Sequence, residues 1–204
     1  MLTVDDIKHW TSKVNRYPGF AQNDYLVAKA FAEPVDSCTH YRRVILLDTL
    51  FSANLRRGPT VHNRQRKEPF QISEDIRACL PRLNQIVVPI LQGGLFQLDL
   101  TDQQVNDSIS EALQTVLSCL NNHNMSFTGK YLHFVFPNVF PLWDKYVRQA
   151  INRIYRRAIF PDNGANTSHY YLLLCQKYKE IIARFTDTEI QAIRQHDAES
   201  LPQD

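Results

Sequence analysis

Hydrophobic residues recur along most of the chain with the spacing of amphipathic helices. Between residues 41 and 57 the apolar positions fall on one side of a helix: Val44, Leu47, Leu50, Phe51 and Leu55. A second apolar face follows a capping sequence at 101–104: Val105, Ile109, Ala112, Leu113, Val116, Leu117 and Leu120. No segment keeps the strict alternation of a half-buried strand, and no repeat is visible. The pattern predicts an all-α fold of several helices.

Capping residues and helix breakers set the expected boundaries. Thr3 and Asp6 form a capping box that opens a first helix, and Pro18-Gly19 ends it. A basic, exposed loop is expected over 58–71, followed by a cap at Ser73, and Thr101 is expected to cap the helix that runs to Leu120. The remaining helices are expected near 23–32, 41–57, 81–91, 127–136, 145–160, 167–184 and 187–198. We expect 1–204 to form a single helical domain, as one compact body or as two helical lobes around a cleft.

Composition excludes several classes of protein. With 44% apolar and 22% charged residues, the 204-residue chain has the make-up of an ordinary folded domain. No apolar run approaches the roughly 20 residues of a membrane helix, and the chain does not start like a signal peptide. The four cysteines form no CxxC pair, which argues against a zinc site. We therefore expect a cytoplasmic monomer that begins at Met1, with no metal, cofactor or membrane contact.

Positive charge is concentrated in two segments although the net charge is only +2. Residues 40–82 contain nine Lys or Arg and four acids, and residues 130–157 contain six Lys or Arg and one acid, Asp144. Such segregation favours a nucleic-acid phosphate backbone as partner, while plain solvation of exposed helix faces remains an open alternative. The expected backbone contacts are Arg56, Arg57, Arg64, Arg66 and Lys67, followed by Arg148, Arg153, Arg156 and Arg157.

Residues 125–148 contain the most informative chemistry. Thr128-Gly129-Lys130 is no phosphate-binding loop of the nucleotide-triphosphate type, because position 124 is Asn and position 131 is Tyr. Lys130 falls in a short helix, and Asp144 stands just before the next one, where a carboxylate accepts bonds from free backbone N–H groups. The loop between them contains two prolines and can double back, which would bring the amine and the carboxylate to one cleft. Asp144 could also be only a helix cap, and Lys130 only a surface lysine.

The order Gly129-Lys130, short apolar helix, turn, Trp143-Asp144 and basic helix resembles the helix–hairpin–helix DNA glycosylases, and is most similar to their 8-oxoguanine-glycosylase-like branch. The resemblance implies that Lys130 is the nucleophile that attacks the sugar and that Asp144 assists departure of the base. It also implies that Gly129 contacts phosphate. The family hairpin reads approximately Leu-Pro-Gly-Val-Gly-x-Lys, whereas residues 124–130 have one glycine and no proline.

A base withdrawn from the stack would be held by ring side chains, for which Tyr131, His133 and Trp143 are the candidates. The sequence thus favours a base-excision-repair glycosylase with lyase activity on abasic DNA, acting on an oxidised base. A non-catalytic nucleic-acid-binding protein on the same scaffold and a helical protein-interaction module are the alternatives. The first requires Lys130 and Asp144 to meet, the second requires only a basic face, and the third requires neither.

Overall fold

The computed structural model describes residues 3–15, 18–50, 55, 67–121, 124–161 and 168–200. Within these ranges every regular element is a helix, which confirms the all-α prediction. The helices are α1 (Val4–Asn15), α2 (Pro18–Ala32), α3 (Ser37–Leu50), α4 (Pro69–Val87), the 3-10 helix η1 (Val88–Gly93), α5 (Gly94–Gln97), α6 (Gln103–Leu117), α7 (Met125–Val135), α8 (Lys145–Tyr155), α9 (Ser168–Ile182) and α10 (Asp187–Ser200). None of the described helices is both long and apolar enough to cross a bilayer.

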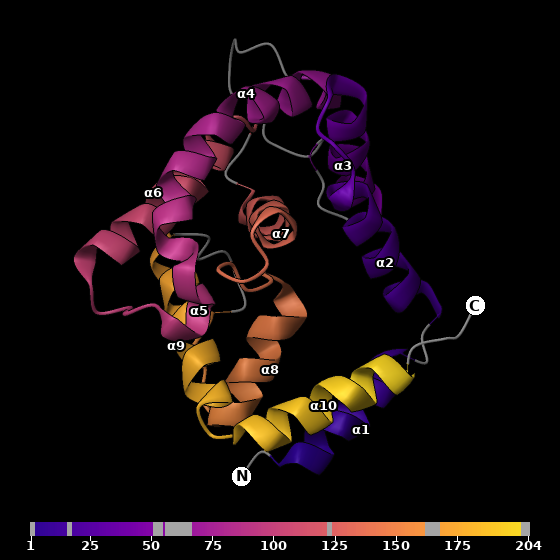
Figure 1. The fold of residues 1–204 in the computed structure, drawn as a ribbon, viewed down its shortest axis with the longest axis vertical. Coiled ribbons are helices and arrows are strands. Elements are labelled where there is room, and N and C mark those ends of the chain that lie inside the picture. The colour runs from indigo at the N-terminus through magenta and orange to yellow at the C-terminus, as the bar shows by residue number, and fades with distance from the viewer. Residues whose placement is uncertain are drawn as a thin grey trace.

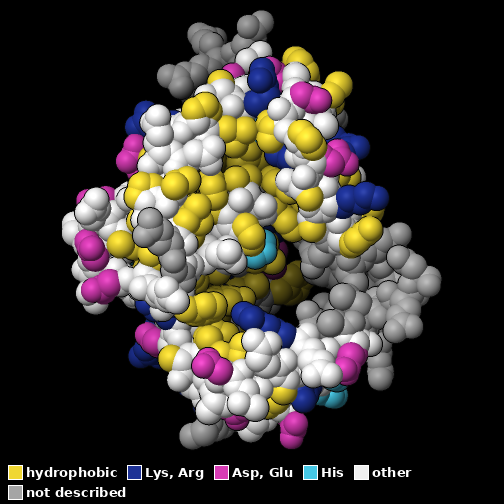
Figure 2. All heavy atoms as spheres, in the orientation of Figure 1, with side chains coloured by type: hydrophobic (Ala, Val, Ile, Leu, Met, Phe, Trp, Pro, Cys, Tyr) yellow, Lys and Arg dark blue, Asp and Glu magenta, His cyan; other side chains and the backbone are white. Residues whose placement is uncertain are grey.

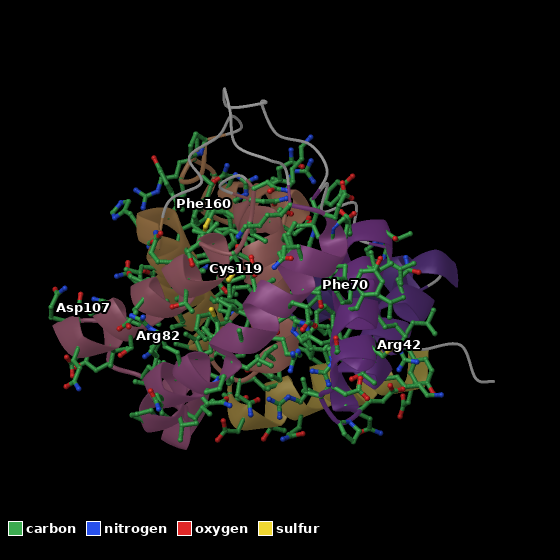
Figure 3. The ribbon with its side chains drawn as sticks, turned by 90° about the horizontal axis from the view of Figure 1, so that it is seen from above. Arg42, Phe70, Arg82, Asp107, Cys119 and Phe160 are labelled. Carbon is green, nitrogen blue, oxygen red and sulfur yellow. The ribbon has the colours of Figure 1, made fainter. Side chains whose placement is uncertain are left out.

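The helices form a ring around α7 (Figure 1). In that view α2 and α3 run along one side, α4 crosses the top, α5, α6 and α9 occupy the other side, and α10 with α1 closes the bottom. Viewed from above, α4 lies between α3 and α6 and packs against both (Figure 3). Because α7 lies inside the ring, even polar residues such as Thr128 and Lys130 are buried on it.

Helix starts follow capping chemistry closely. The N–H of Asp6 donates to Thr3 Oγ1 at 3.1 Å and the N–H of Thr3 donates to Asp6 Oδ2 at 2.9 Å, so the predicted capping box is confirmed. The expected cap at Thr101 is wrong by one residue, because Asp102 accepts from the N–H of Gln104 at 2.8 Å. Thr101 instead donates its N–H and hydroxyl to Asp99.

The segment 69–87 departs most from the sequence prediction. The expected loop through 71, cap at Ser73 and helix at 81–91 are replaced by α4, a single helix that starts at Pro69 and contains Pro81. A proline inside a helix costs about 3 kcal/mol. Burial of the apolar face of α4 offsets that cost, since each fully buried aliphatic side chain contributes about 1.5–3 kcal/mol. The face consists of Ile72, Ile76, Leu83 and Val87.

Other helix boundaries differ by a few residues. α2 begins at Pro18, α3 at Ser37 and α7 at Met125, each earlier than expected. α8 ends at Tyr155 instead of near 160, because Arg156 adopts the left-handed conformation with φ 52° and ψ 33°. Glycine is the usual residue there, and a side chain costs about 1–2 kcal/mol in that conformation. Most of 51–66, including residues 58–66 of the expected basic loop, lies outside the described residues.

A buried hydrogen-bonded chain ties α7 to the top of the ring. His40 of α3 bonds through Nδ1 to Ser73 Oγ of α4 at 2.8 Å and through Nε2 to Tyr131 Oη of α7 at 2.7 Å. His40 is fully buried, and this burial, together with the charge of Arg43, lowers its pKa to about 4. The imidazole is therefore neutral in the folded protein at neutral pH.

We expect His40 to make stability depend on pH. Between pH 6.5 and about 4 the unfolded chain binds a proton at His40 that the folded protein does not bind, so the free energy of unfolding should fall as the pH falls. The loss should reach at most about 3 kcal/mol. Urea denaturation at several pH values would measure it. His40→Gln should flatten this dependence, whereas the same change at exposed His169 should not; an unchanged slope in His40→Gln would contradict the assignment.

Candidate functional site

Lys130 of α7 and Asp144 at the start of α8 meet inside the ring. Lys130 Nζ lies 3.2 Å from Asp144 Oδ2, and it also donates to Ser126 Oγ at 3.1 Å. The side chain of Lys130 is 3% exposed and that of Asp144 is 23% exposed, so solvent reaches the pair from the carboxylate side. The structure thus brings together the two residues whose convergence the glycosylase hypothesis requires.

Two hydrogen bonds hold the loop between α7 and α8. His133 Nδ1 donates to the carbonyl oxygen of Phe140 at 2.8 Å, which folds the loop back along the helix that it has just left. The buried hydroxyl of Tyr171, on α9, donates to the carbonyl oxygen of Pro141 at 2.6 Å. Because carbonyls on two successive residues are fixed from two helices, the approach of the chain to Asp144 is set by tertiary contacts.

Trp143 brings this loop into close contact with α7. A Cβ atom added to Gly129 would overlap the Cβ of Trp143 and lie 3.2 Å from the Tyr171 ring. The indole is 1% exposed and packs against the rings of Tyr171 and Phe160, with centroids 5.6 and 6.1 Å away. Only glycine at 129 therefore leaves room for Trp143, and the seating of Trp143 brings the next residue, Asp144, onto Lys130.

This packing differs from the expected role of Gly129. The glycine lies in the second turn of α7, where its N–H belongs to the internal hydrogen-bond ladder of the helix, and it is buried. A hairpin amide that binds phosphate must project into solvent. The structure therefore does not place Gly129 where it could contact DNA, and its visible role is close packing.

Asp144 performs two tasks with its two oxygens. Oδ1 accepts the N–H of Tyr146 at 2.7 Å and caps α8, while Oδ2 lies against Lys130. The cap holds the carboxylate in one orientation relative to α8. The helix-cap and functional readings of Asp144 are therefore compatible, because each uses a different oxygen.

The expected base-pocket residues do not present ring faces to solvent. Tyr131 is 0% exposed, with its hydroxyl bonded to His40, and Trp143 is enclosed as described. His133 is half-buried and fastens the loop through Phe140. The exposed aromatic residue nearest in sequence to Asp144 is Tyr146, at 69%. Sequence reasoning missed it, although a tyrosine in the first turn after a capping aspartate is visible in the sequence.

The expected DNA contacts separate into three groups. Arg56, Arg57, Arg64 and Arg66 lie outside the described residues. Two others are engaged within the fold: Lys67 Nζ donates to Asp75 Oδ2 at 2.6 Å and to the Cys119 carbonyl, and the guanidinium of Arg148 lies 5.1 Å from the ring centre of Trp143. The third group, on α8 and just beyond it, is exposed: Arg153, Arg156 and Arg157.

A separate cavity of about 670 Å³ lies between α1, α5, α10 and the end of α9. Apolar side chains form most of its wall, among them Ile7, Phe96 and Ile190. It shares no lining residue with the Lys130–Asp144 pair. Its size and lining suit an apolar ligand or side chain, but it offers no lysine or histidine for proton transfer.

We expect Gly129→Ala to disrupt the site through packing. The added methyl group must displace Trp143, and overpacking of this kind costs typically about 1–3 kcal/mol. Urea denaturation should show a lower free energy of unfolding, and the fluorescence of the protein should report a more solvated indole. The exposed, helical Ala150 provides a control, because Ala150→Ser should leave both measurements nearly unchanged. Wild-type stability in Gly129→Ala would rule out the close approach described here.

Within the part of the chain that the structure describes, no three His, Cys, Asp or Glu side chains are grouped so as to hold a metal ion. The polar groups that the structure brings together at the site are the amine of Lys130, the carboxylate of Asp144 and the hydroxyl of Ser126. Comparison of the chain with protein-family models, curated proteins and solved structures finds no match.

Proposed function

We propose that the protein is a DNA glycosylase with lyase activity, which removes an oxidised base and cleaves the strand at the resulting abasic site. The observation that carries the proposal is the 3.2 Å approach of Lys130 Nζ to Asp144 Oδ2 from separate helices. An amine paired with a carboxylate is the minimum that this chemistry needs. The resemblance of residues 129–144 to the helix–hairpin–helix glycosylases supports the same reading.

The burial of the pair supports a functional role over a structural one. Moving two charges out of water costs several kcal/mol per ion, and apolar residues of similar volume usually stabilise a core as well or better. Lys130 is nevertheless almost completely buried, as are Tyr131 and Leu132, the next two residues of α7. A cost of this kind is common at catalytic sites, where charged groups are held in a dry environment.

The reaction follows from the positions of the two groups. Lys130 can act only as the free amine, and Asp144 lies close enough to accept the proton that it gives up and to pass it to the departing base. Nζ attacks sugar C1′, and the bond from C1′ to the base breaks, with its electron pair leaving on the base. The nitrogen then loses one proton, the C1′–O4′ bond breaks with O4′ taking up a proton, and a protonated Schiff base forms at C1′. Water removes a proton from C2′, and the C3′–O bond breaks with its electron pair leaving on the 3′ phosphate.

The ionised form of Asp144 contributes to the first of these steps. Positive charge builds on the sugar as the base leaves, and a carboxylate at this distance from the attacking nitrogen stabilises it, as carboxylates do in glycoside hydrolysis. Capping of α8 through Oδ1 prevents the carboxylate from turning away. The second step, strand cleavage, needs the amine more than the carboxylate.

We expect Lys130→Arg to abolish strand cleavage while it preserves the charge. A guanidinium stays protonated and cannot form a Schiff base, yet it can still pair with Asp144. The test uses duplex oligonucleotides that carry 8-oxoguanine or an abasic site, with borohydride to trap the covalent complex. Wild-type protein should be trapped and the variant should not. Lys130→Gln provides a second variant of different shape, and circular dichroism checks that each is folded.

Failure of the wild-type protein to form a trapped complex on either substrate would refute the lyase proposal. Unmodified DNA binding without trapping would then favour the non-catalytic nucleic-acid-binding alternative. Absence of DNA binding altogether would favour the protein-interaction alternative, for which the cavity beside α10 would be the first surface to examine.

We expect Asp144→Asn to separate the two chemical steps. Asparagine keeps a side-chain oxygen for the N–H of Tyr146, so α8 remains capped. Loss of the negative charge should slow base removal by on the order of a hundredfold or more. Strand cleavage at a ready-made abasic site should fall much less, because the amine remains. Equal loss on both substrates, measured in single-turnover assays, would contradict the assigned division of roles.

A further inference from the structure

The exposed side of α8 and its C-terminal turn carries Lys145, Tyr146, Arg153, Arg156 and Arg157, all exposed to solvent; we call this set the α8 outer face. At about 100° per residue, Lys145, Tyr146 and Arg153 fall within roughly one third of the helix circumference. The opposite side is buried or half-buried through residues such as Val147 and Ile151. α8 therefore has a packed face and a face that carries most of its cations.

The charges on the α8 outer face are not compensated within the described residues. No acid occurs from Lys145 to Pro161, and none of its four cations forms an ion pair with any residue that the structure describes. Several surface cations on other elements do form such pairs. Examples are Arg77 with Glu74, Arg82 with Glu111 and Lys177 with Glu180.

Arg156 adds a second, independent observation. It is the single non-glycine residue with positive φ in the described part of the chain, at a helix C-terminus where glycine is the common choice. Favourable interaction with the helix dipole is a structural reason for a cation at this end. Arg153 already provides that interaction from the last turn. Glycine at 156 would therefore avoid the cost of a side chain in this backbone conformation.

We propose that the α8 outer face binds the phosphate backbone of DNA next to the Lys130–Asp144 site. The inference rests on the proposed function. The α8 outer face takes the place of the glycine hairpin amide as the phosphate contact, because the burial of Gly129 makes that amide inaccessible. α8 is about 16 Å long at 1.5 Å per residue, enough to follow several nucleotides of one strand. Lys and Arg side chains lie over α8 at the lower edge of the central hollow (Figure 2). Tyr146 adds an exposed ring at the end of α8 nearest the site.

Arg156→Gly in the full chain tests this role with little structural cost. Glycine accepts the left-handed backbone, so thermal stability should stay equal or rise, while one phosphate contact is lost. Fluorescence anisotropy with an undamaged duplex should show affinity reduced about fivefold to tenfold at 0.1 M salt. The slope of log K against log salt should become shallower by about 0.9. A triple variant with Arg153→Gln and Arg157→Gln added should lose about three times as much slope.

Arg82→Gln provides the matched control. It removes the same charge from α4, where Arg82 is paired with Glu111, and should leave both affinity and slope unchanged. Equal effects of Arg82→Gln and Arg156→Gly would overturn the proposal, since net charge alone would then explain binding. A wild-type salt slope in the triple variant would overturn it too. So would stronger binding of wild-type protein to phosphatidylserine vesicles than to duplex DNA.

The same measurements separate this inference from the proposed chemistry. Salt-dependent binding that is lost in the triple variant supports the surface even if no covalent complex is ever trapped. If the triple variant is still trapped and binds DNA as tightly as wild type, the result would support the chemistry. It would also refute the α8 outer face as the DNA-binding surface.

Discussion

The close approach of Trp143 to Gly129 is the contact on which the candidate site depends. A residue without a side chain at 129 lets the loop before α8 press against α7, and the indole fills the space between Tyr171 and Phe160. Asp144 follows directly and has little freedom left. The hydrophobic burial of one large ring thus supplies the free energy that places a carboxylate beside a buried amine.

Burial of the resulting Lys130–Asp144 ion pair costs free energy. Lys130 loses nearly all its contact with water, and in return it has Asp144 and Ser126 as polar partners. Removal of one partner from such a pair is usually more damaging than replacement of both by apolar groups. Rigid surroundings keep the cost from being relieved by local movement: α7 is bonded through Tyr131 to His40 and encircled by the other helices (Figure 1).

α8 connects the two parts of the functional proposal. Its first residue follows the carboxylate that caps it, its inner side packs on the core, and its outer side carries cations without partners among the described residues. Arg148 shows how sharply the helix is divided, since this cation points inward and lies over Trp143. A strand of DNA held on the outer face would thus be tied to the helix that also orients Asp144.

Local patterns in the sequence determined the all-α fold, the capping box at Thr3 and the nomination of Lys130 and Asp144. The fold and the capping box depend on periodicity and on hydrogen bonds between near neighbours, which a sequence displays directly. The nomination of Lys130 and Asp144 depends on the proline-containing loop between them and on the resemblance to the helix–hairpin–helix glycosylases. Tertiary packing decided that α4 runs through Pro81 and that Trp143 is core instead of a base-stacking surface. The physical reason is that a sequence shows which side of a helix is apolar. Whether a ring is buried or a cation is left without an ion-pair partner depends on which distant elements the helix meets.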